Sequence, residues 1–98
     1  MKIAKIRQLI FQKQYSISKH AFIESFADNF SIKDILEGVE RGEIIEEYPE
    51  RNRCLIYSNL DKGPIHIVVS YSEINYIWIV TVYKPDPKEW AGNKIRKA

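Results

Sequence analysis

Apolar residues along the chain change their spacing once, near Gly42, from a three- and four-residue period to an alternating one. Before Gly42 the spacing predicts three amphipathic helices, over about residues 2–13, 18–28 and 31–41. After it, four runs rich in β-branched and aromatic residues predict strands: EIIEEY, RCLIYSNL, PIHIVVSY and YIWIVTVY. The expected architecture is therefore α+β, with N-terminal helices packed on one face of a four-stranded antiparallel meander sheet.

The start of the third helix has the most specific local signal. Ser31 as N-cap and Asp34 three residues later form a capping box, and Phe30 and Ile35 occupy the positions of a hydrophobic staple. Ser18 is the expected N-cap of the second helix, whose apolar stripe is Phe22, Ile23, Phe26 and Phe30. The residues expected in the core include Ile35, Leu36, Val39, Val69, Trp78 and Ile79.

Length and composition limit the class of protein. With 98 residues, 45% of them hydrophobic and 29% charged, residues 1–98 are expected to form a single globular domain. No apolar stretch approaches the roughly 18 residues of a membrane span, and the N-terminus alternates charge with apolar residues, so we expect a cytoplasmic protein. The single cysteine, Cys54, excludes an internal disulfide, and with only two histidines beside it the count argues against a structural zinc site, so no metal or cofactor is expected.

Charge is segmented along the chain, although the net charge is only +2. Residues 1–23 carry five bases and no acid, residues 24–50 carry nine acids and two bases, and residues 51–98 carry eight bases and four acids. The two ends can therefore contribute a basic surface that suits a phosphate-rich partner, while mixed surface charge without nucleic-acid binding is the alternative. The acidic EIIEEYPE run is expected to be an edge strand kept from unwanted pairing by its charges.

Four separated motifs, SKHA, GEIIEEYPE, GPIHIVV and TVYKPDPKEW, resemble the domain of unknown function 4258 family over about residues 16–97. Such domains resemble small toxins of type II toxin–antitoxin systems, of the RelE, BrnT and MqsR kind. The resemblance implies a helices-then-meander fold, mRNA cleavage, and an antitoxin-like partner, which in such systems is often a small zinc-finger protein. The family commonly has an arginine about four residues after the histidine of SKHA, whereas this chain has Glu24, which removes a candidate phosphate ligand.

RNA cleavage without a metal needs a base, an acid and a cation to stabilise the phosphorane. The candidates for acid–base catalysis are His20, in the first turn of the second helix, and His66, whose ring is exposed to substrate if its face of the sheet is open. Tyr83 is a further catalytic candidate, and Arg51, Arg53 and Lys84 are the candidate RNA-binding residues.

Each candidate also has a purely structural interpretation. His20 can be a polar first-turn residue paired with Glu24 four positions later, and His66 can be a strand histidine bonded to a neighbouring side chain. Tyr83 and Trp90 can anchor the C-terminal turn.

The sequence accordingly leaves two functions open. The first is a toxin-like, metal-independent endoribonuclease, and the second is a non-catalytic module that binds protein or RNA. Because the inner strands are apolar on both faces, a homodimer or an antitoxin partner is expected to cover the helix-free face or the edge strand.

Overall fold

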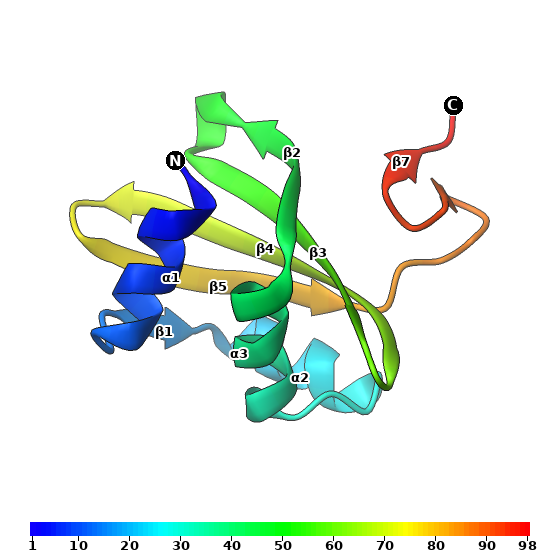
Figure 1. Cartoon of the computed structure of the whole chain (residues 1–98), viewed down its shortest axis with the longest axis horizontal. Coiled ribbons are helices and arrows are strands. Elements are labelled where there is room, and N and C mark those ends of the chain that lie inside the picture. Colours follow the sequence, from blue (N-terminus) through cyan, green and yellow to red (C-terminus); the bar gives the residue numbers. More distant parts are fainter.

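A computed structural model describes residues 1–98 and has three α-helices and a five-stranded sheet, followed by a short hairpin (Figure 1). The helices are α1 (Ile3–Phe11), α2 (Lys19–Ala27) and α3 (Ile32–Arg41), and a single 3₁₀ turn, η1, covers Pro49–Arg51. The strands are β1 (Tyr15–Ile17), β2 (Glu43–Tyr48), β3 (Arg53–Leu60), β4 (Gly63–Glu73), β5 (Tyr76–Tyr83), β6 (Trp90–Ala91) and β7 (Ile95–Arg96).

The sheet has the strand order β1-β5-β4-β3-β2. Strands β2 to β5 form the expected antiparallel meander, and β2 is an edge strand as predicted. The prediction of four strands, all antiparallel, is wrong, because β1 adds a fifth strand that runs parallel to β5, with Tyr15 opposite Ile77. A strand of three residues is too short to produce an alternating pattern of apolar and polar residues, so the sequence did not predict β1.

Helix α3 begins as the capping box predicts. The Ser31 hydroxyl accepts a hydrogen bond from the Asp34 N–H at 3.1 Å, and the Asp34 carboxylate accepts one from the Ser31 N–H at 2.8 Å. The helix packs closely on the sheet, since a Cβ built on Gly38 would lie 2.8 Å from Ile67 Cδ1. At its other end, the Arg7 guanidinium of α1 donates to the carbonyls of Val39 and Gly42 and so ties α1 to the C-terminus of α3.

Helix α2 and the turn after it bury only one residue of the predicted stripe, Phe30, which is 5% exposed. Phe22, Ile23 and Phe26 are exposed, and the buried residues of α2 are Ala21 and Ser25. The prediction failed because α2 runs along the free edge of β5 beyond the short β1 strand, where small and polar residues are required. Figure 1 shows α2 beside β5, whereas α1 and α3 lie across the face of the sheet.

The main core lies between the helices and one face of the sheet. Of the residues expected there, Ile35, Val39, Val69 and Ile79 are fully buried, and Cys54 on β3 is buried beside them. Two predictions are wrong. Leu36 is only partly buried, because it lines an open groove between α1, β1 and α3, and Trp78 is 39% exposed, because it points away from the helices.

The helix-free face is partly covered by the chain itself. The C-terminal hairpin, residues 90–96, comprises β6 and β7 and folds back so that Trp90, only 2% exposed, packs on His66 of β4. The chain itself therefore covers this part of the sheet, and the expected homodimer or antitoxin partner stays a prediction. Exposed apolar side chains also lie on the helices and on a turn, and Phe11, Phe22, Phe26 and Ile74 are examples. No helix is both long and apolar enough to cross a bilayer.

Candidate functional site

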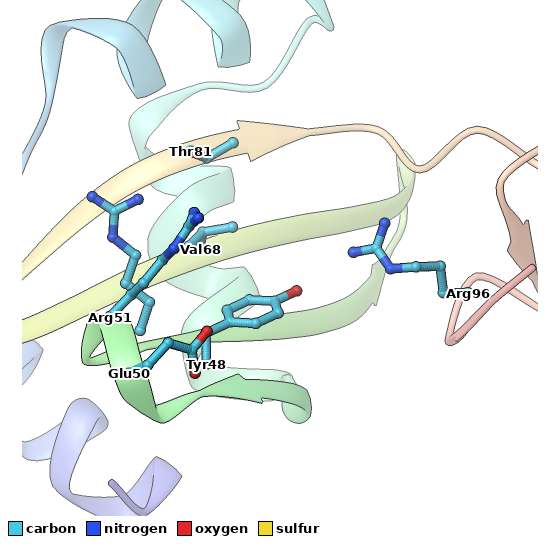
Figure 2. A pocket seen from close by; sticks show the side chains of 7 residues that line it. Tyr48, Glu50, Arg51, Val68, Thr81 and Arg96 are labelled. Atoms are coloured by element: carbon cyan, nitrogen blue, oxygen red, sulfur yellow. The ribbon is translucent and has the colours of Figure 1, made fainter.

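A hollow of about 440 Å³ opens on the helix-free face of the sheet, beside the C-terminal hairpin (Figure 2). Val68 and Thr81, neighbours across β4 and β5, line it from the sheet. The remaining lining residues are polar or charged and come from β2, η1, β3 and β7: Tyr48, Glu50, Arg51, Arg53 and Arg96. Three guanidinium groups from separate elements thus converge on one depression.

Arg51 and Arg53 are held there by the connection between β2 and β3. Pro49 starts the η1 turn, and Asn52 closes it with a φ of 52°, a left-handed conformation that asparagine tolerates better than most residues. Neither guanidinium makes a hydrogen bond or an ion pair within the protein, whereas Arg7, Arg41 and Arg96 each do. Arg51 and Arg53 are consequently free to bind an anion.

The third arginine is already paired. Arg96 Nη2 lies 3.0 Å from Glu46 Oε1, which also accepts a hydrogen bond from the Tyr48 hydroxyl. Burial alone would raise the pKa of Glu46, but the hydrogen bonds from Arg96 and Tyr48 outweigh it and lower that pKa. The hollow therefore has one neutralised cation at its hairpin side and two free cations at its η1 side, and the Glu50 side chain is its one acidic lining residue.

His66 lies on the same face, under the C-terminal hairpin, and is completely buried. Its Nε2 lies 2.6 Å from the Asn93 carbonyl oxygen, so Nε2 carries the proton and donates it. Its Nδ1, 3.2 Å from the Tyr83 hydroxyl, accepts a hydrogen bond from that group. The rings of Tyr57, Tyr83 and Trp90 surround the imidazole in edge-to-face contacts, at 4.5 Å for Trp90.

This environment sets the protonation of the pair. Burial lowers the pKa of His66, although the Asn93 carbonyl and the Glu46 charge act in the opposite direction. Burial also raises the pKa of Tyr83 to about 12. Both groups are thus held neutral and hydrogen-bonded to each other. The condition under which His66 would be exposed to substrate is not met, because the hairpin covers this part of the face.

His20 lies on a different element and has a different environment. Its side chain is 68% exposed near the start of α2, and its Nε2 lies 3.2 Å from Glu24 Oε1, which is the i,i+4 pair expected from the sequence. Glu24 also accepts a hydrogen bond from the Val82 N–H at 3.1 Å. No contact joins His20 to His66 or to the arginines of the hollow.

The structure therefore brings together only part of the predicted site. Arg51 and Arg53 meet in the hollow, and His66 contacts Tyr83. Lys84 follows β5 and lies near Gly63 at the start of β4, and its backbone N–H donates to the Asp28 carboxylate at 2.9 Å. It does not line the hollow.

Sequence reasoning missed Arg96 and misplaced Trp78. Arg96 follows Trp90 by six residues in a basic tail, and its cation lies 4.5 Å from the centre of the Trp90 ring, but no sequence pattern indicates that the tail turns back over the sheet. The alternation of YIWIVTVY was a usable signal for Trp78, because it places the indole on the face opposite to Ile77 and Ile79.

Comparison with known families gives one match. The sequence profile of the family described as Domain of unknown function (DUF4258) matches residues 17–84. The match includes β2 to β5, His20, His66 and the arginines of η1 and β3, and it ends before the C-terminal hairpin. No curated protein matches the chain.

Proposed function

The chain belongs to the family described as Domain of unknown function (DUF4258), and from this premise we propose that it is an RNA-binding module related to RelE-like toxins. The observation that carries the proposal is the pair of unpaired guanidinium groups, Arg51 and Arg53, at one edge of the hollow. Guanidinium groups match phosphate oxygens in geometry and charge, and phosphate contacts dominate the affinity of proteins for nucleic acids.

The fold is compatible with this relationship. Helices that precede an antiparallel β2-β3-β4-β5 order agree with the helices-then-meander arrangement expected of RelE-like toxins, and the parallel β1 strand is an addition to it. The partner of such a module would be a small antitoxin-like protein or a second copy. Such a partner could contact the exposed apolar side chains of α1 and α2, which include Phe11, Phe22 and Phe26.

Ribonuclease activity is the second candidate function, and the 3.2 Å contact between His66 and Tyr83 favours it. A neutral imidazole beside a phenol is a suitable acid–base pair. Catalysis would require the C-terminal hairpin to leave the sheet, because His66 has no exposed surface beneath it. In the closed arrangement the protein binds RNA without cleaving it.

The test is binding of a fluorescently labelled RNA by anisotropy at several salt concentrations. We expect the double variant Arg51→Gln/Arg53→Gln to bind more weakly and to reduce the slope of log K against log salt by about 0.7 for each lost phosphate contact. Arg41→Gln is the matched control, because Arg41 lies on α3 and pairs with Glu37 at 3.7 Å.

If the double variant and the Arg41→Gln control bind RNA equally well, the hollow is not the RNA site and the proposal fails. Cleavage of the RNA by the wild-type protein, abolished in His66→Gln, would instead establish the second candidate function.

A further inference from the structure

Trp78 is the one large aromatic side chain exposed on the open part of the helix-free face. Residues that face one another across neighbouring strands point to the same side of a sheet. The register places Tyr48 opposite Arg53, Arg53 opposite Ser70, and Ser70 opposite Trp78. These four residues therefore form one row across β2, β3, β4 and β5, on the face that holds the hollow.

The row that contains Trp78 extends from the hollow, because its members Tyr48 and Arg53 also line the hollow. Val68 and Thr81, which are opposite each other, are the neighbouring positions on β4 and β5. Arg53 and Trp78 are separated by two strand spacings, about 10 Å. A single ligand can reach both the free guanidinium groups and the indole.

The indole is held in a fixed orientation. Its Nε1–H donates to the Glu73 carboxylate at 2.7 Å, and the Tyr76 ring contacts it edge-on with centroids 6.3 Å apart. The polar edge of the ring is thus already satisfied, and the ring remains 39% exposed. A fixed, exposed aromatic ring is a suitable stacking surface for a flat, unpaired base.

We infer that the hollow and Trp78 together bind single-stranded RNA, with phosphates on Arg51 and Arg53 and an unpaired base stacked on Trp78. This inference rests on the proposed RNA-binding function and narrows it to unpaired strands. A duplex keeps its bases stacked on one another, so it can contact the arginines but cannot stack on the indole.

Tryptophan fluorescence tests the stacking directly, because the chain has two tryptophans and Trp90 is only 2% exposed. Addition of a single-stranded RNA oligonucleotide is expected to quench the emission of Trp78, and an RNA duplex of the same length is expected not to. In Trp78→Phe the quenching disappears while affinity, measured by anisotropy, stays close to that of the wild type.

Loss of the ring should weaken single-strand binding selectively. Trp78→Thr removes the ring but introduces a β-branched residue that suits a strand, and it is expected to bind single-stranded RNA about 5- to 150-fold more weakly and duplex RNA with unchanged affinity. Phe22→Ala is the control, because Phe22 is also half-exposed but lies on α2, and we expect it to leave both affinities unchanged. Circular dichroism establishes that each variant is folded.

The outcomes separate this inference from the function on which it rests. Weaker binding by Arg51→Gln/Arg53→Gln, with no effect of Trp78→Thr, overturns the stacking site and leaves the RNA-binding function in place. Equal quenching by single-stranded DNA of the same sequence overturns the restriction to RNA. Polyglutamate that competes as well as RNA assigns the hollow to an acidic protein and overturns both proposals.

Discussion

The two histidines of this chain differ most in burial. His66 is fully buried, whereas the side chain of His20 is 68% exposed and paired with Glu24. Both were candidates for the same reaction, because residue type and position in an element do not reveal whether a distant segment covers a side chain. His66 is buried because Trp90 and Asn93, which follow it by more than twenty residues, contact its ring.

The buried His66 predicts a pH dependence of stability. Because burial lowers its pKa in the folded state, the unfolded chain, with an ordinary histidine pKa of about 6.5, binds the proton more tightly. The stability that the neutral His66 contributes is therefore complete above about pH 6.5, and it is lost as the pH falls from there towards the lower folded-state pKa. Glu46 and Arg96 are the charged groups near the ring, and they act in opposite directions on its pKa.

Urea unfolding at pH 7.5, 6.5 and 5.5 measures the effect. We expect the free energy of unfolding to fall across this range in the wild type and in His20→Gln, and to change much less in His66→Gln. Glu46, with its lowered pKa, contributes stability that is complete above its ordinary pKa of 4.5 and is lost only below it, so this contribution does not change across the measured range. A similar fall in all three proteins would show that His66 is not the group responsible.

At the scale of elements, α2 protects an edge of the sheet. Strand β1 pairs with β5 only as far as Ile79, so the next backbone groups of β5 lack a strand partner. Side chains before and on α2 replace it, since the Ser18 hydroxyl donates to the Val80 carbonyl and Glu24 accepts from the Val82 N–H. Asp28 does the same for Lys84. Charged side chains at such an edge also prevent pairing with other chains.

This arrangement predicts that Glu24 stabilises the fold. Glu24→Ala leaves the Val82 N–H without its partner and should cost about 1–3 kcal/mol of unfolding free energy, whereas Glu24→Gln keeps an acceptor and should cost less. Glu37→Ala is the control, because it removes an exposed helical ion pair with Arg41 that is expected to contribute only about 0–1 kcal/mol. Equal losses in Glu24→Ala and Glu37→Ala, measured by urea unfolding, would contradict this role.

Sequence patterns predicted where helices and strands lie along the chain better than they predicted the contacts between these elements. The capping box of Ser31 and Asp34 located the start of α3, and alternation located β2 to β5, because both signals are local. The three-residue β1 strand and the orientation of α2 depend on contacts with β5, more than fifty residues away in sequence. In the candidate site, Arg51 and Arg53 were recognisable from their position beside a turn, but Arg96 and the cover over His66 depend on the return of the chain's last residues.

At the scale of the whole molecule, the C-terminal hairpin is a separable cover on one end of the sheet. The cluster that forms the helix-side core contains no residue beyond Val82, and the family match ends at Lys84. The hairpin is held by Trp90 on His66, by the Arg96–Glu46 ion pair at 3.0 Å, and by the Lys94–Glu43 ion pair at 2.9 Å. The Lys94–Glu43 pair is exposed on both sides and Arg96 is about half exposed, so water screens these ion pairs, and the buried Trp90 is the main anchor.

Removal of this anchor should open the hairpin without unfolding the sheet. In Trp90→Ala we expect the backbone amide protons at position 90 and at Lys97, which bond to the carbonyls of Asp86 and Glu89, to exchange much faster, while those of β3 and β4 stay protected. With its cover gone, His66 is hydrated and its pKa, followed by NMR, should rise towards about 6.5. Trp90→Phe keeps an apolar anchor and should change both observables less. Global loss of protection in Trp90→Ala, or an unchanged His66 titration, would show that the hairpin is part of the cooperative core.

If the hairpin does open, RNA cleavage that appears only in Trp90→Ala, and is abolished by adding His66→Gln, would mean that the hairpin restrains a catalytic His66–Tyr83 pair.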